Sequence, residues 1–187
     1  QPESSFMGTA GQAGFPRVNQ LQYWVDQGLL AGAPELELDG QGVATNVERL
    51  PRWNVPGDGG DTANSPADIE HRLRAYLEVN CQHCHNDKGA ASNTGYYLDV
   101  FRAVDAGYGI CKKPTATGGG SCGRQHVVVP GSSDDSIVSC RMEAENDPQR
   151  MMPPIARSVA HDGATALMRQ WINTVVDGDY DNADGCN

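Results

Sequence analysis

Two cysteines and a histidine near the middle of the chain have a spacing that can do chemistry. They belong to the segment Cys81-Gln82-His83-Cys84-His85. In such a pattern each thiol can add to one vinyl group of a haem, while the adjacent histidine ligates the iron through an imidazole nitrogen. The sequence therefore predicts one covalently bound haem c, with Cys81 and Cys84 as thioether anchors and His85 as an axial ligand. We interpret His83 as a solvent-facing spacer.

Two other chemistries use closely spaced cysteines, and each needs features that the rest of the chain does not offer. A zinc site would need a second pair of ligands at similar spacing, but a long glycine-rich stretch separates Cys111 from Cys122. A redox dithiol would be expected in a parallel βαβ pattern, and the sequence shows no such alternation. Haem attachment is therefore the favoured interpretation.

An electron-transfer haem needs a second axial ligand, and methionine raises the reduction potential by favouring the ferrous state. The best candidate segment is Met151-Met152-Pro153-Pro154, because prolines restrict the backbone that must hold the thioether. We expect Met152 to be the ligand, with Met151 as the alternative. His126 or His161 would instead give bis-histidine ligation and a lower potential.

Apolar periodicity and capping residues predict four helices that would position these groups. One is defined by Ser65-Pro66, a capping hydroxyl followed by a proline at the first helical position, and it would end just before Cys81. Met142 and Met168 lie on the apolar stripes of two later helices and are expected to fill the core. The best candidate for a strand is the short run 127–129. The expected helices span 19–30, 66–79, 134–142 and 163–176.

Charge and composition exclude several functions. The chain has 187 residues and a formal net charge of −10, which argues against binding to nucleic acid or to an anionic membrane surface. It contains 22 Gly and 11 Pro but only three Phe and three Trp, so we expect many loops and few large core side chains. A buried haem would supply the missing apolar bulk. No apolar run is long enough to span a bilayer, and we expect a basic or neutral redox protein as the partner.

The four remaining cysteines are even in number and have no metal-like spacing, so they predict two disulfides. Of the three pairings, the glycine-rich loop between Cys111 and Cys122 favours a bridge between these two, which leaves Cys140 with Cys186. Disulfides and covalent haem together predict a periplasmic or extracellular protein. Because the chain opens on Gln1 and shows no signal peptide, we expect an exported protein in its mature form, with a fragment of a longer precursor as the alternative.

Three parts are expected along the chain. An N-terminal segment, 1–64, holds one short helix and packs on the core; a haem domain spans 65–176; and an acidic tail spans 177–187. The tail has carboxylates at alternate positions, like the start of a calcium loop, but lacks the glycine and the bidentate glutamate of a complete one. A solvated tail tied down by a disulfide is therefore favoured over calcium. The candidate calcium ligands are Asp177, Asp179 and Asp181.

The chain resembles the class I cytochromes c. The resemblance is carried by a helix that runs into the haem motif, a loop-rich middle, a Met-Pro-Pro loop and a closing helix with Trp171, and it covers about 66–176. It implies a mainly α haem domain with long loops, in which the first and last helices cross and one haem edge is exposed for electron exchange. Tyr96, Tyr97 and Ile155 are candidates for the pocket wall because they lie near the two ligand segments.

A closer resemblance is to a bacterial family of poorly characterised c-type cytochromes. Members of this family can carry a further haem module upstream, whereas this chain has one attachment motif. The resemblance is carried by Tyr76-Leu77 before Asn80-Cys81, by Cys111-Lys112-Lys113-Pro114, by Val129-Pro130-Gly131 with Ser136, and by Arg141-Met142 followed by Met151-Met152-Pro153.

These features predict an electron carrier rather than an enzyme. A single electron would pass through the haem to or from another redox protein. Two alternatives stay open: a haem subunit or domain of a periplasmic dehydrogenase, and a structural haem subunit of an extracellular electron-conducting assembly. In either case the chain would associate with a larger subunit or with copies of itself.

Overall fold

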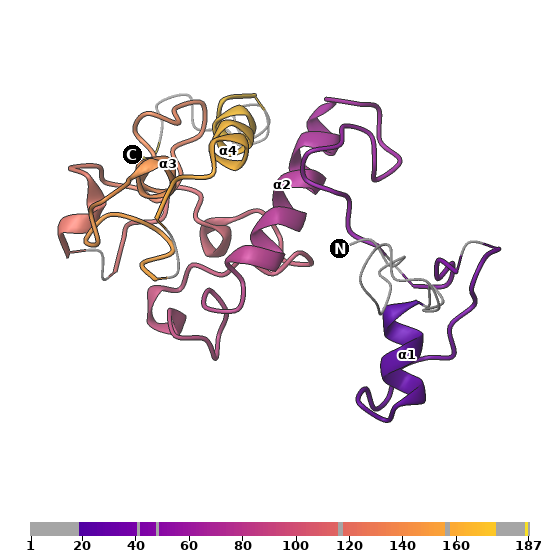
Figure 1. Cartoon of the computed structure of the whole chain (residues 1–187). Helices are drawn as coiled ribbons and strands as arrows, with labels where there is room; N and C mark the ends of the chain where they lie inside the picture. Colours follow the sequence, from indigo (N-terminus) through magenta and orange to yellow (C-terminus); the bar gives the residue numbers. More distant parts are fainter. Residues whose placement is uncertain are drawn as a thin grey trace. The chain divides into compact units, whose positions relative to one another are not determined.

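The computed structural model describes residues 19–40, 42–47, 49–115, 118–155, 158–174 and 186. Within these ranges the chain forms four α-helices joined by long loops, and no β-strand (Figure 1). The prediction of a mainly α chain with many loops is confirmed. The strand expected at 127–129 is wrong, because this run forms only an isolated bridge, between Val128 and Ile110, and the neighbouring His126 bridges to Ser136.

The chain divides into two compact units, 1–50 and 51–187. In the first unit, helix α1 (Gln20–Asp26) begins where the sequence predicted, because the Asn19 side chain accepts hydrogen bonds from the first turn of the helix. The helix ends earlier than expected, just before Gly28, whose φ of 66° lies in the left-handed region. A positive φ ends a right-handed helix, so the predicted extension to residue 30 does not form.

The boundary between the units falls earlier than the expected one after residue 64. Residues 51–64 belong to the second unit because hydrogen bonds attach them to helix α2 (Pro66–Asn80). The Asp68 carboxylate accepts hydrogen bonds from the backbone of Gly57 and Asn64, both at 2.8 Å, and Arg72 donates to the Trp53 carbonyl at 2.9 Å. These polar contacts join the segment to helix α2.

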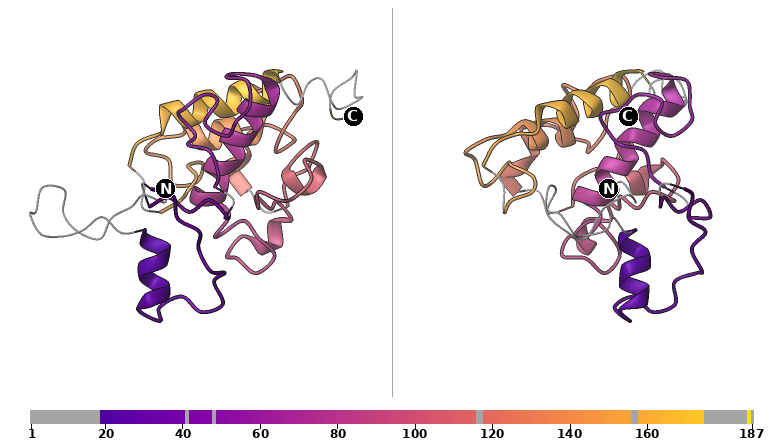
Figure 2. Two further views of the ribbon diagram at one scale, coloured as in Figure 1. Left: turned by 90° about the vertical axis from the view of Figure 1, so that its right-hand side faces the viewer. Right: turned by 45° about the vertical axis from the view of Figure 1, so that its right-hand side comes forward.

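Helix α2 places the cysteine motif, and its predicted range is confirmed to within one residue. The Ser65 hydroxyl caps it by accepting from Asp68 N, and Pro66 occupies its first position. Its buried stripe packs against helix α4 (Asp162–Thr174), and the two helices lie side by side in Figure 2. The side chains of the stripe are Ile69, Leu73 and Leu77.

The two closing helices complete the core. Helix α3 (Ile137–Glu143) begins later than expected because Ser133 and Ser136 form a turn before it, and it contacts α4. In α4, Trp171 and Ile172 are almost fully buried, and the Trp171 indole N–H donates to Glu70 of α2 at 3.3 Å. The core therefore joins α2, α3 and α4, and the last two residues expected in α4, 175 and 176, lie outside the described residues.

The pairing of the four other cysteines differs from the expected one. The disulfides are Cys111–Cys186 and Cys122–Cys140, so the predicted bridges Cys111–Cys122 and Cys140–Cys186 are wrong. The short 3₁₀-helix η3 (Gly118–Ser121) packs on α3 and brings Cys122 to Cys140. Cys111 instead lies beside Val128, whose carbonyl accepts a hydrogen bond from Cys111 N at 2.9 Å and lies 3.6 Å from the Cys186 sulfur. Tertiary packing overrides proximity in sequence here.

Non-reducing peptide mapping by mass spectrometry is expected to recover a fragment that links Cys122 to Cys140. Breaking this bridge with the double substitution to serine should cost about 3 kcal/mol of unfolding free energy, since it closes a loop of 18 residues. Serine substitution at Cys111 and Cys186, which close a loop of 75 residues, should cost about 4 kcal/mol. Urea titrations of the two double variants and the wild type measure both losses. A fragment that links Cys111 to Cys122 would contradict the pairing.

Candidate cofactor pocket

A cavity of about 410 Å³ opens between the end of α2, the loop that follows it, α3 and the segment before α4. This volume is within the range of roughly 300–1,000 Å³ that is typical of small-molecule sites. The cavity brings together the three reactive groups of the motif and Met152. Most of the remaining wall is apolar and includes Leu77, Leu98, Val127, Ile137, Val138 and Met142.

The turn after α2 carries both thiols and the imidazole. The backbone N–H groups of Cys84 and His85 both donate to the Cys81 carbonyl, at 3.1 and 3.0 Å, which closes the turn. The two cysteines are not joined to each other. Burial raises the pKa of the Cys81 thiol to about 11, with a smaller contribution from Cys84. A thiol that stays protonated at neutral pH is a poor redox nucleophile, which disfavours the dithiol alternative.

The zinc alternative finds no support in the geometry either. Among the residues that the structure describes, no three His, Cys, Asp or Glu side chains are grouped so that they could hold a metal ion. A structural zinc site would need four such ligands in a closed tetrahedron. Cys81, Cys84 and His85 therefore do not form part of a zinc site with other described residues.

His85 is oriented by a backbone carbonyl that the sequence did not identify. Its Nδ1 lies 3.1 Å from the Tyr96 carbonyl oxygen, and its ring packs against the Tyr96 ring with centroids 5.1 Å apart. Burial lowers the pKa of His85, although the hydrogen bond to Tyr96 acts in the opposite direction. The neutral imidazole then donates from Nδ1 and keeps Nε2 available as a ligand.

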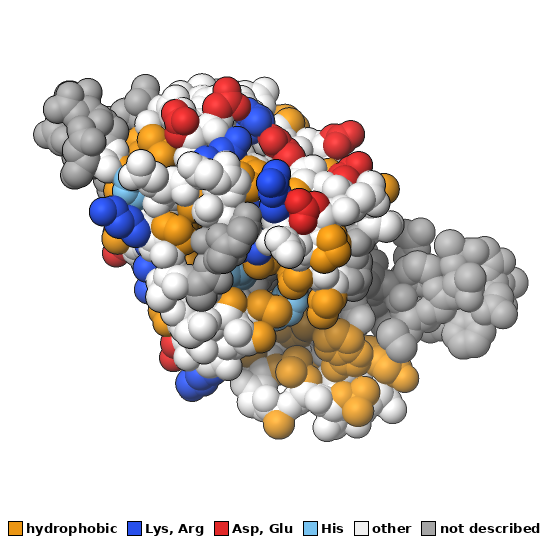
Figure 3. All heavy atoms as spheres, turned by 90° about the vertical axis from the view of Figure 1, so that its left-hand side faces the viewer, with side chains coloured by type: hydrophobic (Ala, Val, Ile, Leu, Met, Phe, Trp, Pro, Cys, Tyr) orange, Lys and Arg blue, Asp and Glu red, His pale blue; other side chains and the backbone are white. Residues whose placement is uncertain are grey.

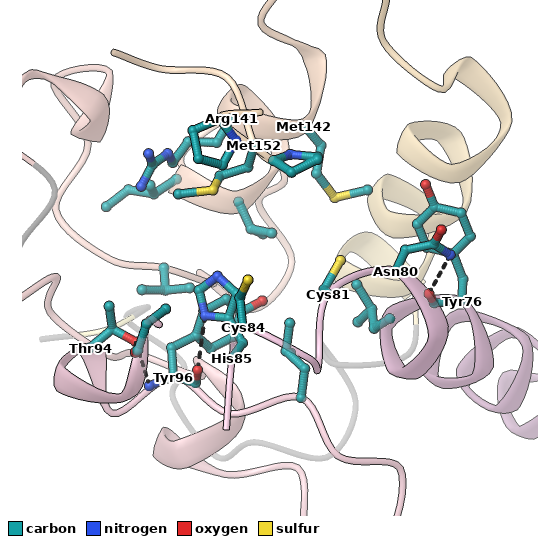
Figure 4. A pocket seen from close by; sticks show the side chains of 18 of the residues that line it. Tyr76, Asn80, Cys81, Cys84, His85, Thr94, Tyr96, Arg141, Met142 and Met152 are labelled. Atoms are coloured by element: carbon teal, nitrogen blue, oxygen red, sulfur yellow. Dashed lines mark hydrogen bonds between the residues drawn. The ribbon is translucent and has the colours of Figure 1, made fainter. Parts of the chain in front are cut away.

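Met152 lies across the cavity from His85. Figure 4 shows the Met152 thioether on the opposite wall, above the His85 ring, with Met142 beside it. The Met152 backbone N–H donates to the Arg141 carbonyl at 2.9 Å, which attaches the loop to the end of α3. Met151 does not line the cavity. Met142 and Met168 are both buried in the core, as expected, but the sequence did not indicate that Met142 also faces the cavity.

The two histidines that the sequence offered as alternative ligands have different positions. His161 lines the cavity, where its Nδ1 is 3.0 Å from the Tyr76 hydroxyl and its ring packs edge-on against Trp53. His126 does not line the cavity and pairs instead with Ser136 through the backbone. Bis-histidine ligation would therefore have to use His161.

Of the three candidates for the pocket wall, the structure brings one to the cavity. Tyr96 lines it, but Tyr97 and Ile155 do not, contrary to expectation. The Tyr97 hydroxyl donates to the Ser92 carbonyl at 2.9 Å, and its ring lies under the Arg102 guanidinium. Ile155 is 75% exposed. Side chains at successive positions of an extended segment point to opposite sides, which separates Tyr96 from Tyr97.

The candidate calcium ligands Asp177, Asp179 and Asp181 lie outside the described residues.

No helix in the described ranges is long and apolar enough to cross a membrane. The two disulfides are consistent with an oxidising compartment outside the cytosol.

The residues around the cavity fit a covalently held haem. Two thiols and an imidazole come from the turn after α2, a thioether lies on the wall opposite the imidazole, and the remaining wall is mainly apolar. A histidine nitrogen and a methionine sulfur are the two axial ligands that hold the iron in cytochromes c. Comparisons of the chain with protein-family models, with curated proteins and with solved structures gave no match.

Proposed function

We propose that this protein is a monohaem c-type cytochrome that transfers single electrons. The observation that carries the proposal is the meeting of Cys81, Cys84 and His85 with Met152 around one apolar cavity, although Met152 is far from the motif in sequence. When bound, the haem would supply a one-electron ferric/ferrous couple. We expect the protein to act as a carrier and not to catalyse a reaction of its own.

Each group around the cavity would have a definite role in this function. Cys81 and Cys84 would anchor the cofactor through thioether bonds, and the Tyr96 carbonyl would hold the His85 ring so that Nε2 serves as the axial ligand. The Met152 thioether would favour the ferrous state and raise the reduction potential. The apolar wall would exclude water, which tunes the potential further.

The arrangement of the helices supports a fold of the class I cytochrome c type. That resemblance implies contact between the helix before the motif and the closing helix, and α2 packs against α4 through Leu73, Leu77 and Trp171. The disulfides support a periplasmic or extracellular location, which is also where haem is attached to c-type cytochromes.

The charge of the chain supports a redox partner with a basic or neutral docking surface. The formal net charge is −10. On the face shown in Figure 3, acidic side chains gather in the upper part, where Lys and Arg side chains lie among them. Attraction between this acidic face and a basic partner surface would mainly accelerate the encounter of the two proteins. With such a partner, the rate of electron transfer between them should fall as ionic strength rises.

Expression together with the c-type maturation machinery is expected to give a protein with one covalently bound haem. Intact-mass measurement should show the chain plus one haem, and the haem should stay on the chain in a denaturing gel. Replacing both Cys81 and Cys84 by alanine should abolish the covalent haem completely, because no thioether can form. A wild-type chain that carries no haem after such expression would refute the proposed function.

A further inference from the structure

The cavity wall carries a cation whose charge the described part of the chain does not balance. Arg141, near the end of α3, lines the cavity and is half-buried. Its Nε donates to the Arg150 carbonyl at 3.0 Å, and no carboxylate of the described residues forms an ion pair with it. Most other described arginines do have an acidic partner. Those with a carboxylate are Arg52, Arg72, Arg74, Arg102, Arg150 and Arg169.

The position of Arg141 is costly unless an anion reaches it. Its guanidinium lies half-buried in the wall, so it has lost part of its hydration, and its Nε bonds to a neutral carbonyl. A cation in a mainly apolar wall is tolerated when it gains an anionic, hydrogen-bonded partner. The protein has an excess of acidic groups, yet none of the described carboxylates forms an ion pair with Arg141. The counter-charge is therefore expected to come from the molecule that fills the cavity.

A second cation lies on the same cavity. The Lys112 side chain lines the cavity, and its ammonium group lies over Gly95. A Cβ atom added to Gly95 would be 3.3 Å from Lys112 Nζ. Gly95 follows Thr94, which also lines the cavity. In Figure 4, Arg141 and Thr94 lie at one end of the cavity and Cys81 lies at the other. The two cations thus mark the end of the cavity that is remote from the first anchoring thiol.

The chemistry of haem matches this polarity. Haem carries its two vinyl groups and its two carboxylate groups on different pyrrole rings, so anchoring the vinyl groups at Cys81 and Cys84 directs the carboxylates toward the other end. We infer that Arg141, assisted by Lys112, binds the carboxylates of the haem. The inference rests on the proposed function. The guanidinium can offer both Nη groups to one carboxylate, because Nε is already bonded to Arg150.

The same arginine would connect the carboxylate end of the cofactor to the axial methionine. The Arg141 carbonyl accepts from Met152 N, and its side chain holds the Arg150 carbonyl of the same loop. Arg141 is thus both a binding residue for the carboxylate and a positioning residue for the Met152 loop. A test must therefore separate the charge of Arg141 from its structural hydrogen bonds.

The test compares four haem-loaded proteins: wild type, Arg141→Gln, Arg141→Lys and the control Arg124→Gln. Resonance Raman spectroscopy reports the bending band of the haem carboxylates, and spectroelectrochemistry reports the reduction potential. Arg141→Gln is expected to shift the carboxylate band and lower the potential, because it removes a positive charge next to the cofactor. Arg141→Lys should shift the band but keep a potential close to that of wild type. Arg124 donates to the Ser136 carbonyl and does not line the cavity, so its variant should match wild type in both.

The possible outcomes separate the inference from the proposed function. An unchanged carboxylate band in Arg141→Gln that still holds its haem would overturn the inference and leave the proposed function intact. Absence of haem from the wild-type protein would overturn both. If Arg141→Gln fails to fold, Arg141→Lys decides alone, since a shifted band supports the inference and an unshifted band refutes it.

Discussion

Replacing Met152 by alanine is expected to abolish the weak near-infrared absorption band of the ferric haem protein and to lower its reduction potential. The band arises from a thioether bound to ferric iron, and the thioether is also what favours the ferrous state. The fall should be a sizeable part of the roughly 0.8 V over which axial ligands set haem potentials. Absorption spectra of the oxidised protein and a spectroelectrochemical titration measure the two effects.

Two neighbouring methionines provide matched controls for this experiment. Met151→Ala removes a thioether that does not line the cavity, so the band and the potential should both be retained. Met142→Ala removes one that does line it, so it tests whether the second thioether on that wall is the ligand instead. Survival of the band in Met152→Ala, together with its loss in Met142→Ala, would transfer the role to Met142.

Replacing Asp68 by alanine is expected to destabilise the second unit by about 3–5 kcal/mol, the usual cost of removing one partner of a buried ion pair. Asp68 is 1% exposed, and its carboxylate accepts from Gly57 N, Asn64 N and Arg72 Nε at 2.8, 2.8 and 3.0 Å. The substitution leaves the buried Arg72 without its carboxylate and removes the hydrogen bonds by which Gly57 and Asn64 are held to α2. Urea unfolding followed by circular dichroism measures the loss.

Asp61→Asn is the matched control for this substitution. Asp61 lies in the same segment and pairs with His71 at 2.7 Å, but His71 is 56% exposed. Solvent-exposed pairs contribute at most about 1 kcal/mol, so the control should unfold at nearly the wild-type urea concentration. Equal losses in Asp61→Asn and Asp68→Ala would contradict the importance that we assign to burial.

The same carboxylate makes stability depend on pH. Burial by itself would raise the pKa of Asp68, but the hydrogen bonds from Gly57, Asn64 and Arg72 together lower it below its usual value. A carboxyl group with a lowered pKa in the folded state contributes stability above its unfolded pKa, and this contribution disappears as the pH falls through the folded pKa. We expect the stability of the wild type to fall below about pH 4, the ordinary pKa of Asp. Asp68→Asn should show a smaller fall between neutral and acid pH.

The features that could be predicted from the sequence are those that depend on a few adjacent residues. Ser65 and Pro66 act on the first turn of α2, and Asn19 acts on the first turn of α1, so both helix starts were correct. The spacing of Cys81, Cys84 and His85 is likewise a property of one turn. Local patterns were weaker at predicting where helices end, as the early end of α1 before Gly28 shows.

By itself, the sequence determined the cysteine motif, the presence of four helices, the acidic charge and the candidate segment Met151-Met152-Pro153-Pro154, while the position of Met152 across the cavity depends on the tertiary structure. Only the tertiary structure decided the disulfide pairing, the Tyr96 carbonyl that orients His85, and the position of Arg141 on the cavity wall. The physical reason is that caps, turns and attachment spacings are governed by neighbouring residues, whereas these other features depend on which distant segments pack together. Burial of α2 against α4 and of η3 against α3 selects those segments, and no local periodicity records the choice.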